Sequence, residues 1–149
     1  MKLLLTRELG RLAKWLRILG FDVEYFSQNK PSSLIIKALQ EDRMIVTRNH
    51  HLPQGRGIRI ITIESEKLKE QIPQLLKELK IKPDQAAMFT RCTICNVELV
   101  EIEKEKVKEK VPEYVFKTQE DFITCPKCAR IYWQGTHWGN VQQMLEEIK

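Results

Sequence analysis

Two pairs of cysteines constrain this chain more than any other feature. Two residues separate Cys92 from Cys95 and Cys125 from Cys128, and 29 residues lie between the pairs. Each C-x-x-C turn presents two thiolates, so two such turns supply the four sulfurs of a tetrahedral zinc site. One pair alone would also suit redox chemistry, but two copies without a helix opening at either favour structural zinc. We therefore expect Zn²⁺ to fold a small C-terminal module, with His137 as the one other candidate ligand.

The composition is that of a folded globular protein. Of the 149 residues, 42% are hydrophobic and 30% are charged, which excludes a disordered or fibrous chain and a large multidomain enzyme. No apolar run approaches the roughly 20 residues that a membrane span needs. The charges that follow MKLLL would interrupt the apolar region of a signal peptide, so we expect a cytoplasmic protein without membrane association.

The first half of the chain alternates short apolar strands with amphipathic helices. The expected strands are Met1–Leu5, Val23–Tyr25, Met44–Thr47 and Ile58–Ile63. The expected helices are Glu8–Leu19, one capped by Ser32 or Ser33 that reaches Gln40, and one that reaches Lys80 with Pro73 at its first turn or at a kink. Strands separated by helices of this length predict a parallel sheet with helices on its faces. We expect this α/β domain over residues 1–86 and a zinc ribbon over 87–149.

Two segments of the second half are informative besides the cysteines. Glu101–Lys110 alternates acids and bases, which predicts a solvated hairpin or short helix between the two metal-binding turns. Val141–Ile148 has apolar residues at helical spacing, which predicts a short terminal helix that docks on the rest of the protein.

A basic helix face is the first candidate nucleic-acid surface. With 25 Lys and Arg against 20 Asp and Glu, the net charge of +5 favours polyanionic partners. On the first helix Arg7, Arg11 and Lys14 lie opposite the apolar face, and Arg17 flanks them. No acid on this face offsets the cations, so a phosphate backbone is a natural counterpart, and ordinary solvation is the alternative.

Two further groups suggest a binding surface. Arg48, His50 and His51 follow the strand Met44–Thr47, at the strand end where open α/β sheets place ligands; loop residues without a role are the alternative. Near the C-terminus Trp133, His137 and Trp138 gather flat rings that can stack on bases or pack around the cysteine turns.

Several segments resemble one family. They are GRLAKWLRILGFDVEY, RMIVTRN, RCTICN, VPEYV and FITCPKCARIYWQGTHW. Over nearly its whole length the chain resembles the Mut-seven C-terminal RNase family, in which a PIN-like domain is fused to a zinc ribbon. The resemblance implies a three-layer α/β/α sandwich, an RNA substrate, and acidic side chains that hold Mg²⁺ or Mn²⁺ for ribonuclease activity.

The acidic positions of the family are not acidic in this chain. The resemblance places them at Thr6, at Ser33 with an uncertainty of one residue, and at Asn49. Neutral oxygens do not offset the cost of dehydrating a hard divalent cation. We therefore expect an RNA-binding, catalytically degenerate homologue that docks structured RNA or a ribonucleoprotein such as the ribosome, with Mg²⁺ or Mn²⁺ required only if the nuclease is active.

Two alternatives remain open at this point. In the first, the protein is an active metal-dependent ribonuclease whose acids have moved to nearby positions. The candidates for such moved acids are Glu8, Asp22, Glu24, Glu41, Asp42 and Glu64. In the second, the protein is a protein-binding adaptor that does not contact RNA.

Overall fold

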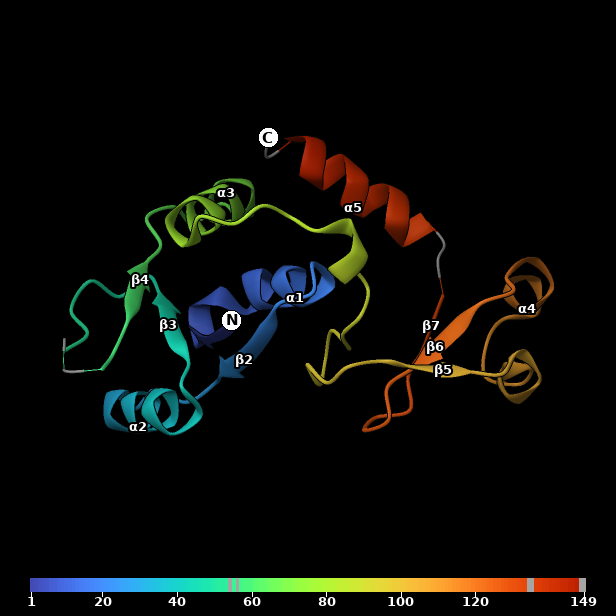
Figure 1. Cartoon of the computed structure of the whole chain (residues 1–149), viewed down its shortest axis with the longest axis horizontal. Helices are drawn as coiled ribbons and strands as arrows, with labels where there is room; N and C mark the ends of the chain where they lie inside the picture. The colour runs from blue at the N-terminus through green and yellow to red at the C-terminus, as the bar shows by residue number, and fades with distance from the viewer. Residues whose placement is uncertain (54, 56, 134–135, 148–149) are drawn as a thin grey trace.

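The computed structural model describes residues 1–53, 55, 57–133 and 136–147, with side chains at all of these except 136–140. Its first part consists of β1 (Lys2–Thr6), the 3-10 turn η1 (Arg7–Leu9), α1 (Gly10–Ile18), β2 (Asp22–Phe26), α2 (Pro31–Glu41), β3 (Met44–Thr47), β4 (Ile60–Thr62) and α3 (Leu68–Leu79). Its second part consists of η2 (Gln85–Ala87), β5 (Val100–Ile102), η3 (Lys104–Val107), α4 (Glu113–Thr118), β6 (Phe122–Thr124), β7 (Ile131–Trp133) and α5 (Thr136–Glu147). Figure 1 shows the parallel sheet with its helices and the antiparallel sheet side by side along the long axis, with α5 lying over α1. No helix in the described part of the chain is long and apolar enough to cross a membrane.

The first part is built on a parallel sheet with the strand order β2-β1-β3-β4. The central strand β1 pairs on both sides, with Leu3 opposite Val23 of β2 and Met44 of β3. Leu3–Leu5 are fully buried, because helices cover both faces of the sheet around this central strand. The chain leaves β1 through α1 to reach β2, then returns through α2 to reach β3. The connections thus diverge between β1 and β3, where open α/β sheets form a crevice.

Helices pack on both faces of this sheet. Figure 1 shows α2 on one side and α1 with α3 on the other. The buried cluster on the α1 and α3 side includes Leu12, Leu16, Ile72 and Leu75. The cluster on the α2 side includes Leu34 and Ala38 with residues of β1 and β3. The expected α/β architecture with a parallel sheet between helices is confirmed.

The second part has an antiparallel sheet with the order β5-β6-β7. Its small core consists of Val107, Val111, Val115 and Phe122, and the ring of Trp133 packs edge-on against Phe122 at a centroid distance of 6.4 Å. The charged stretch 101–110 contains part of β5 and the turn η3, as expected, but Val107 within it is fully buried. One apolar residue in this charged run therefore anchors it to the core.

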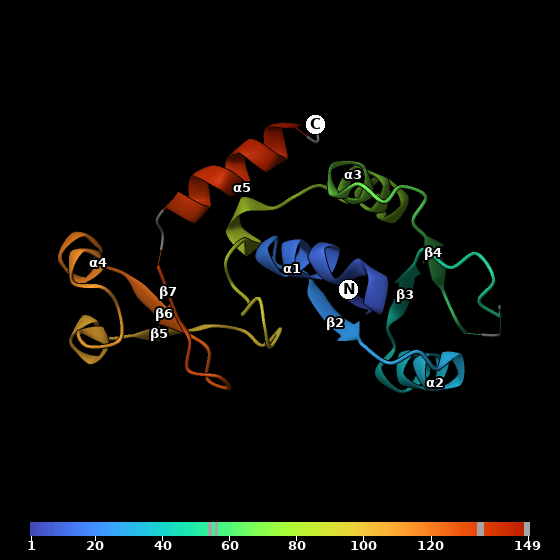
Figure 2. The ribbon, with the colours of Figure 1, turned by 180° about the vertical axis from the view of Figure 1, so that it is seen from behind.

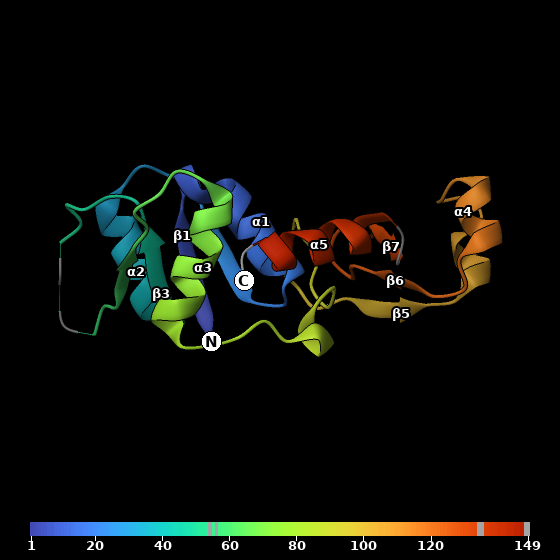
Figure 3. The ribbon, with the colours of Figure 1, turned by 90° about the horizontal axis from the view of Figure 1, so that it is seen from above.

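The terminal helix α5 returns to the first part of the chain. Val141 is buried in the cluster shared with α1 and α3, and Met144 and Leu145 pack against it. Lys69 Nζ lies 2.8 Å from Glu147 Oε2. Figures 2 and 3 show α5 lying beside α1 and reaching towards α3. Docking of the terminal helix is confirmed, and the division of domains at residues 86 and 87 stays a prediction.

One local expectation was wrong, and a second is narrowed. The helix α2 begins at Pro31 with Lys30 as its N-cap residue, so neither Ser32 nor Ser33 caps it. Proline suits the first helical position because its fixed φ is helical and it has no N–H to leave unpaired. In α3, Pro73 lies inside the helix, so of its two expected placements the first turn is excluded.

Candidate functional site

The four cysteines converge in the second part of the chain. Their Sγ atoms all lie within 4.8 Å of one another, and those of Cys92 and Cys128 are 3.7 Å apart. Tetrahedral zinc with Zn–S bonds of about 2.3 Å separates its sulfurs by about 3.8 Å. Cys92 and Cys125 are buried, whereas Cys95 and Cys128 are half-buried. The cysteine cluster therefore fits a four-coordinate structural metal such as zinc.

Both cysteine turns have the same backbone form. The residues that follow the pairs, Asn96 and Ala129, have φ values of 66° and 63°. Their N–H groups donate to the carbonyls of Cys92 and Cys125 at 2.9 Å. Asparagine accepts this left-handed conformation readily, whereas alanine adopts it at a steric cost.

The protonation of the free thiols is uneven. Hydrogen bonds from the backbone and side chain of Arg130 lower the pKa of Cys128 to about 6. Desolvation and the neighbouring thiols raise the pKa of Cys95 to about 12. The four sulfurs are thus not all ionised together without a cation, and metal binding must release protons.

Arg17 fastens the first cysteine turn to the sheet. Its Nε donates to Val23 O at 2.9 Å, and its Nη1 donates to Thr93 O at 2.9 Å and Ile94 O at 3.1 Å. The side chain is buried, unlike the other cations of α1, and the predicted contact of Arg17 with RNA stays a prediction. The signal available in the sequence was its position four residues after the buried Ala13, at the edge of the apolar face.

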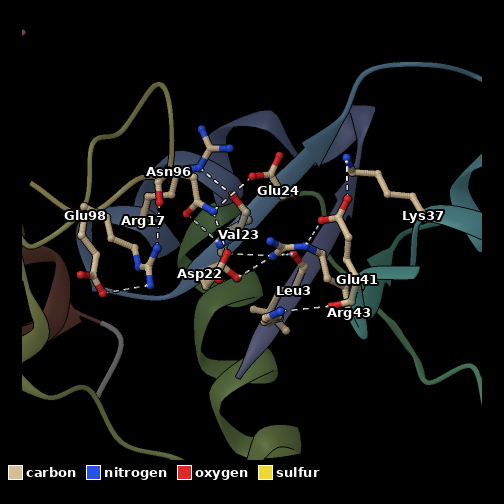
Figure 4. A network of polar contacts seen from close by, with 12 residues as sticks. Leu3, Arg17, Asp22, Val23, Glu24, Lys37, Glu41, Arg43, Asn96 and Glu98 are labelled. Atoms are coloured by element: carbon tan, nitrogen blue, oxygen red, sulfur yellow. Dashed lines mark hydrogen bonds and ion pairs between the residues drawn. The ribbon is translucent and has the colours of Figure 1, made fainter. Parts of the chain in front are cut away.

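Asn96 makes the second connection and was missed as a site residue. Its Oδ1 accepts from Val23 N at 2.9 Å, and its Nδ2 donates to Asp22 Oδ1 at 2.7 Å. The amide therefore pairs with the outer edge of β2 much as another strand would (Figure 4).

The amino ends of β1 and β2 hold a group of ion pairs. Arg43 donates to Asp22 Oδ1 at 2.8 Å, to Glu41 Oε1 at 2.7 Å and to Leu3 O at 3.1 Å. Lys37 Nζ lies 3.0 Å from the other oxygen of Glu41. Figure 4 shows these side chains around one guanidinium group. Two of the candidate moved acids, Asp22 and Glu41, are thus committed to structural pairs at the end of the sheet opposite the crevice.

The strand-end crevice lies at the carboxyl ends of β1 and β3. Thr6 Oγ1 donates to Glu8 Oε1 at 2.6 Å and lies 2.9 Å from Thr47 Oγ1. The same Glu8 oxygen accepts from Thr47 Oγ1 at 3.2 Å and from Arg48 N at 3.0 Å. These groups border a cavity of about 170 Å³. The residues that line this cavity include Thr6, Arg7, Glu8, Lys30, Thr47 and Asn49.

Of the three positions implied by the family resemblance, two line the strand-end crevice and one does not. Thr6 and Asn49 line the strand-end crevice, but Ser33 lies half-buried on α2 and is not among the described lining residues. Asn49 Oδ1 accepts from His51 N at 2.9 Å, so its side chain shapes the turn after β3. Lys30, just before α2, reaches the crevice instead of Ser33.

Glu8 stays ionised in this setting. Partial burial by itself raises the pKa of the Glu8 carboxyl, but the hydrogen bonds from Thr6, Arg48 and Thr47 outweigh it and hold the pKa below the ordinary value of 4.5. Glu64 follows β4 and is exposed, with its Oε2 3.6 Å from His50 Nε2. Both acids are among the candidate moved acids of the sequence analysis, but only the fold shows that Glu8 lines the crevice.

The other predicted contact residues have different surroundings. Arg7, Arg11 and Lys14 are exposed, as are His50 and His51, while Arg48 is half-buried. Trp133 is half-buried and packs on Phe122. The side chains of His137 and Trp138 lie outside the described part of the chain.

One of three comparisons with known proteins finds a match. No curated protein and no solved structure matches the chain. The family model of the Mut7-C RNAse domain matches residues 1–145, which include both the parallel sheet and the cysteine cluster. This match indicates a nuclease-like or RNA-related role. On this evidence the chain belongs to the Mut7-C RNAse domain family.

Proposed function

We propose that this protein binds RNA at the strand-end crevice without a divalent metal ion, as a family member that has lost hydrolysis. The observation that supports this proposal is the set of side chains where β1 and β3 end. Thr6, Thr47 and Asn49 are neutral there, and Glu8 is the one carboxylate among the described residues that line the crevice.

This set is poorly suited to Mg²⁺ or Mn²⁺. Such ions need several oxygen ligands and strongly favour carboxylates. One oxygen of Glu8 already accepts three hydrogen bonds, and a metal would have to displace them. Across the described residues, the four cysteines are the one group of three or more His, Cys, Asp or Glu side chains that could hold a metal ion.

The same surroundings favour a phosphate backbone. Arg7 and Lys30 line the crevice, and Arg48 stands between its lining residues Thr47 and Asn49 in the chain. Arg11 and Lys14 are exposed further along α1. A single carboxylate repels phosphate far less than a cluster of three would, so RNA can dock without a metal to neutralise the site.

The direct test measures binding and cleavage together. Purified protein is incubated with structured and single-stranded RNA, in EDTA-free buffer with and without Mn²⁺, and both retention and cleavage are scored. We expect equal retention in the two buffers and no cleavage in either. Cleavage that depends on Mn²⁺ would contradict the proposal, and so would the absence of retention.

A matched pair of variants locates the contact. Lys30→Gln removes a cation at the crevice, and Lys108→Gln removes an exposed cation from the second part of the chain. We expect Lys30→Gln to weaken RNA binding several-fold and to lower the salt dependence by about one charge. Lys108→Gln is expected to bind as the parent does, and equal effects of the two variants would indicate attraction by net charge alone.

A second candidate function rests on Glu8. Its carboxylate stands at the crevice although the family position two residues earlier is Thr6. A ribonuclease with moved acids would use Glu8 as a metal ligand. In that case the parent would cleave RNA in Mn²⁺ and Glu8→Gln would abolish the cleavage, whereas under our proposal Glu8→Gln leaves RNA retention intact.

A further inference from the structure

A second cavity lies between α1, the first cysteine turn and β7. Its volume is about 330 Å³, at the lower end of the range for small-molecule sites. Its lining includes aliphatic side chains and the aromatic and cationic residues Lys14, Trp15, Phe89, Arg91, Tyr132 and Trp133. We call it the aromatic cavity. It is distinct from the strand-end crevice, which lies beyond the other end of α1.

The rings around the aromatic cavity are held in place by the fold. Trp15, Phe89, Tyr132 and Trp133 are all half-buried, so each keeps part of its surface accessible. The Tyr132 hydroxyl lies 3.1 Å from Cys92 Sγ and 3.4 Å from Thr93 Oγ1. A ligand that stacks here meets rings that are already ordered, which lowers the entropic cost of binding.

Two cations border these rings. Lys14 is exposed on α1. Arg91 is half-buried; its Nη1 donates to Asn96 O at 2.8 Å, and its Nη2 lies 3.8 Å from Glu98 Oε1. Lys14 is thus the cation of the two that has no carboxylate partner among the described residues. Flat aromatic walls beside positive charge match a nucleobase with its phosphate, whereas a purely apolar ligand would gain nothing from the cations.

The basic face of α1 connects the two sites. Arg11 and Lys14 lie three residues apart on α1, which places them on one side of the helix, and Arg7 lies in the turn η1 just before it. Arg7 lines the strand-end crevice and Lys14 lines the aromatic cavity. Seven residues of helix span roughly 10 Å, a distance that a few nucleotides of extended RNA cover.

We propose that the aromatic cavity holds an unpaired RNA nucleobase, with the adjoining phosphate at Lys14. This inference rests on the proposed RNA binding and names its substrate class as single-stranded RNA. A base inside a duplex cannot enter, because its faces are covered by its neighbours.

The main experiment needs no variant of the protein. Fluorescence anisotropy compares three labelled probes: a short oligouridine, a ribose-phosphate chain of the same length without bases, and an RNA duplex of the same strand length. Quenching of tryptophan fluorescence is recorded in each titration. We expect the oligouridine to bind at least about tenfold more tightly than either other probe, and to quench the fluorescence.

Substitutions at Trp15 then assign the effect to the cavity. Trp15→Leu keeps an apolar side chain but removes the ring, and Trp15→Phe keeps a ring. We expect a loss of roughly tenfold in oligouridine affinity for the first and a smaller loss for the second. Tyr114→Leu is the matched control, since Tyr114 is an aromatic residue on α4 with 71% of its surface exposed. Thermal unfolding checks that each variant folds.

The outcomes separate this inference from the proposed function. If the base-free chain or the duplex binds as tightly as the oligouridine, or if folded Trp15→Leu binds as the parent does, the aromatic cavity is not a base site. RNA binding at the strand-end crevice would then still stand. Failure of the parent to bind any of the three probes would overturn both proposals.

Discussion

The two ends of the parallel sheet use charge in opposite ways. At the amino ends of β1 and β2, the carboxylates of Asp22 and Glu41 are matched by Arg43, and Asn96 covers the edge of β2. At the carboxyl ends, Glu8 is held by hydroxyl and backbone N–H groups, while Arg7 and Lys30 line the crevice beside it.

This contrast separates structural charge from charge that is free to bind a ligand. Arg43 has only 8% of its side chain exposed, so it stabilises the fold and is inaccessible to a partner. Cations near the crevice are exposed or line a cavity, and they add little to stability. Changes at the amino end should therefore lower stability, and changes at the carboxyl end should alter binding.

The largest expected effect is loss of the metal. Cys92→Ser, or removal of zinc by a chelator, should unfold the second sheet and release Asn96 and Arg17 from their partners. Metal analysis of protein prepared under reducing conditions should show about one zinc per chain. Protein that contains no zinc and keeps the same circular dichroism after chelation would contradict this prediction.

Arg17→Met tests the connection at the amino end. It leaves the carbonyls of Val23, Thr93 and Ile94 without their donor, so we expect a loss of roughly 2–4 kcal/mol in the free energy of unfolding. Denaturant titration measures the loss. Arg11→Met is the control on the same helix, because Arg11 is exposed and its substitution should change stability little.

Restoring acids tests the carboxyl end. Thr6→Asp with Asn49→Asp adds two carboxylates near Glu8, and the variant should gain affinity for Mn²⁺ that the parent lacks. Calorimetry detects this gain. A control with Thr118→Asp and Gln119→Asp adds the same charge on and just after α4. If the crevice variant binds no more Mn²⁺ than the control, Thr6 and Asn49 do not face a common metal position.

Arg43→Met and Lys30→Gln compare the two ends of the parallel sheet in their effects on stability and on RNA affinity. Arg43→Met should cost about 1–2 kcal/mol of stability, because the half-buried Asp22 loses its partner, and should leave RNA affinity unchanged. Lys30→Gln should do the reverse. Denaturant titration measures the stability of both variants, and fluorescence anisotropy measures their RNA affinity. If the two variants lose stability and affinity to the same extent, the two ends do not differ in role.

The smallest effect concerns acid stability. Hydrogen bonds hold the pKa of Glu8 below 4.5, and the hydrogen bonds and charge of Arg43 outweigh burial to lower that of Asp22. A carboxyl whose pKa is lower in the folded state stabilises the fold above its unfolded value, and this contribution disappears as the pH falls through the folded value. Melting temperatures should therefore drop below about pH 4.5, and the drop should be smaller in Glu8→Gln.

Local patterns in the sequence were sufficient for the strands and helices of the parallel sheet and for the four cysteines that gather in one cluster. The apolar run Leu3–Leu5 predicts a strand buried on both faces, and two C-x-x-C turns specify four sulfurs whatever connects them. The terminal helix could be predicted from its apolar spacing, because a helix with one apolar face must bury that face. These features depend on residues close together in the chain.

Only the tertiary structure decided which polar side chains meet. The sequence did not distinguish Arg17 from the exposed cations of α1, and its role appears only when the cysteine turn docks some 76 residues later in the chain. Glu8 was one of six candidate acids until β1 and β3 placed Thr6, Thr47 and Arg48 around it. A hydrogen bond requires its donor and acceptor to lie about 3 Å apart, and spacing along the chain does not set that distance for residues on different elements.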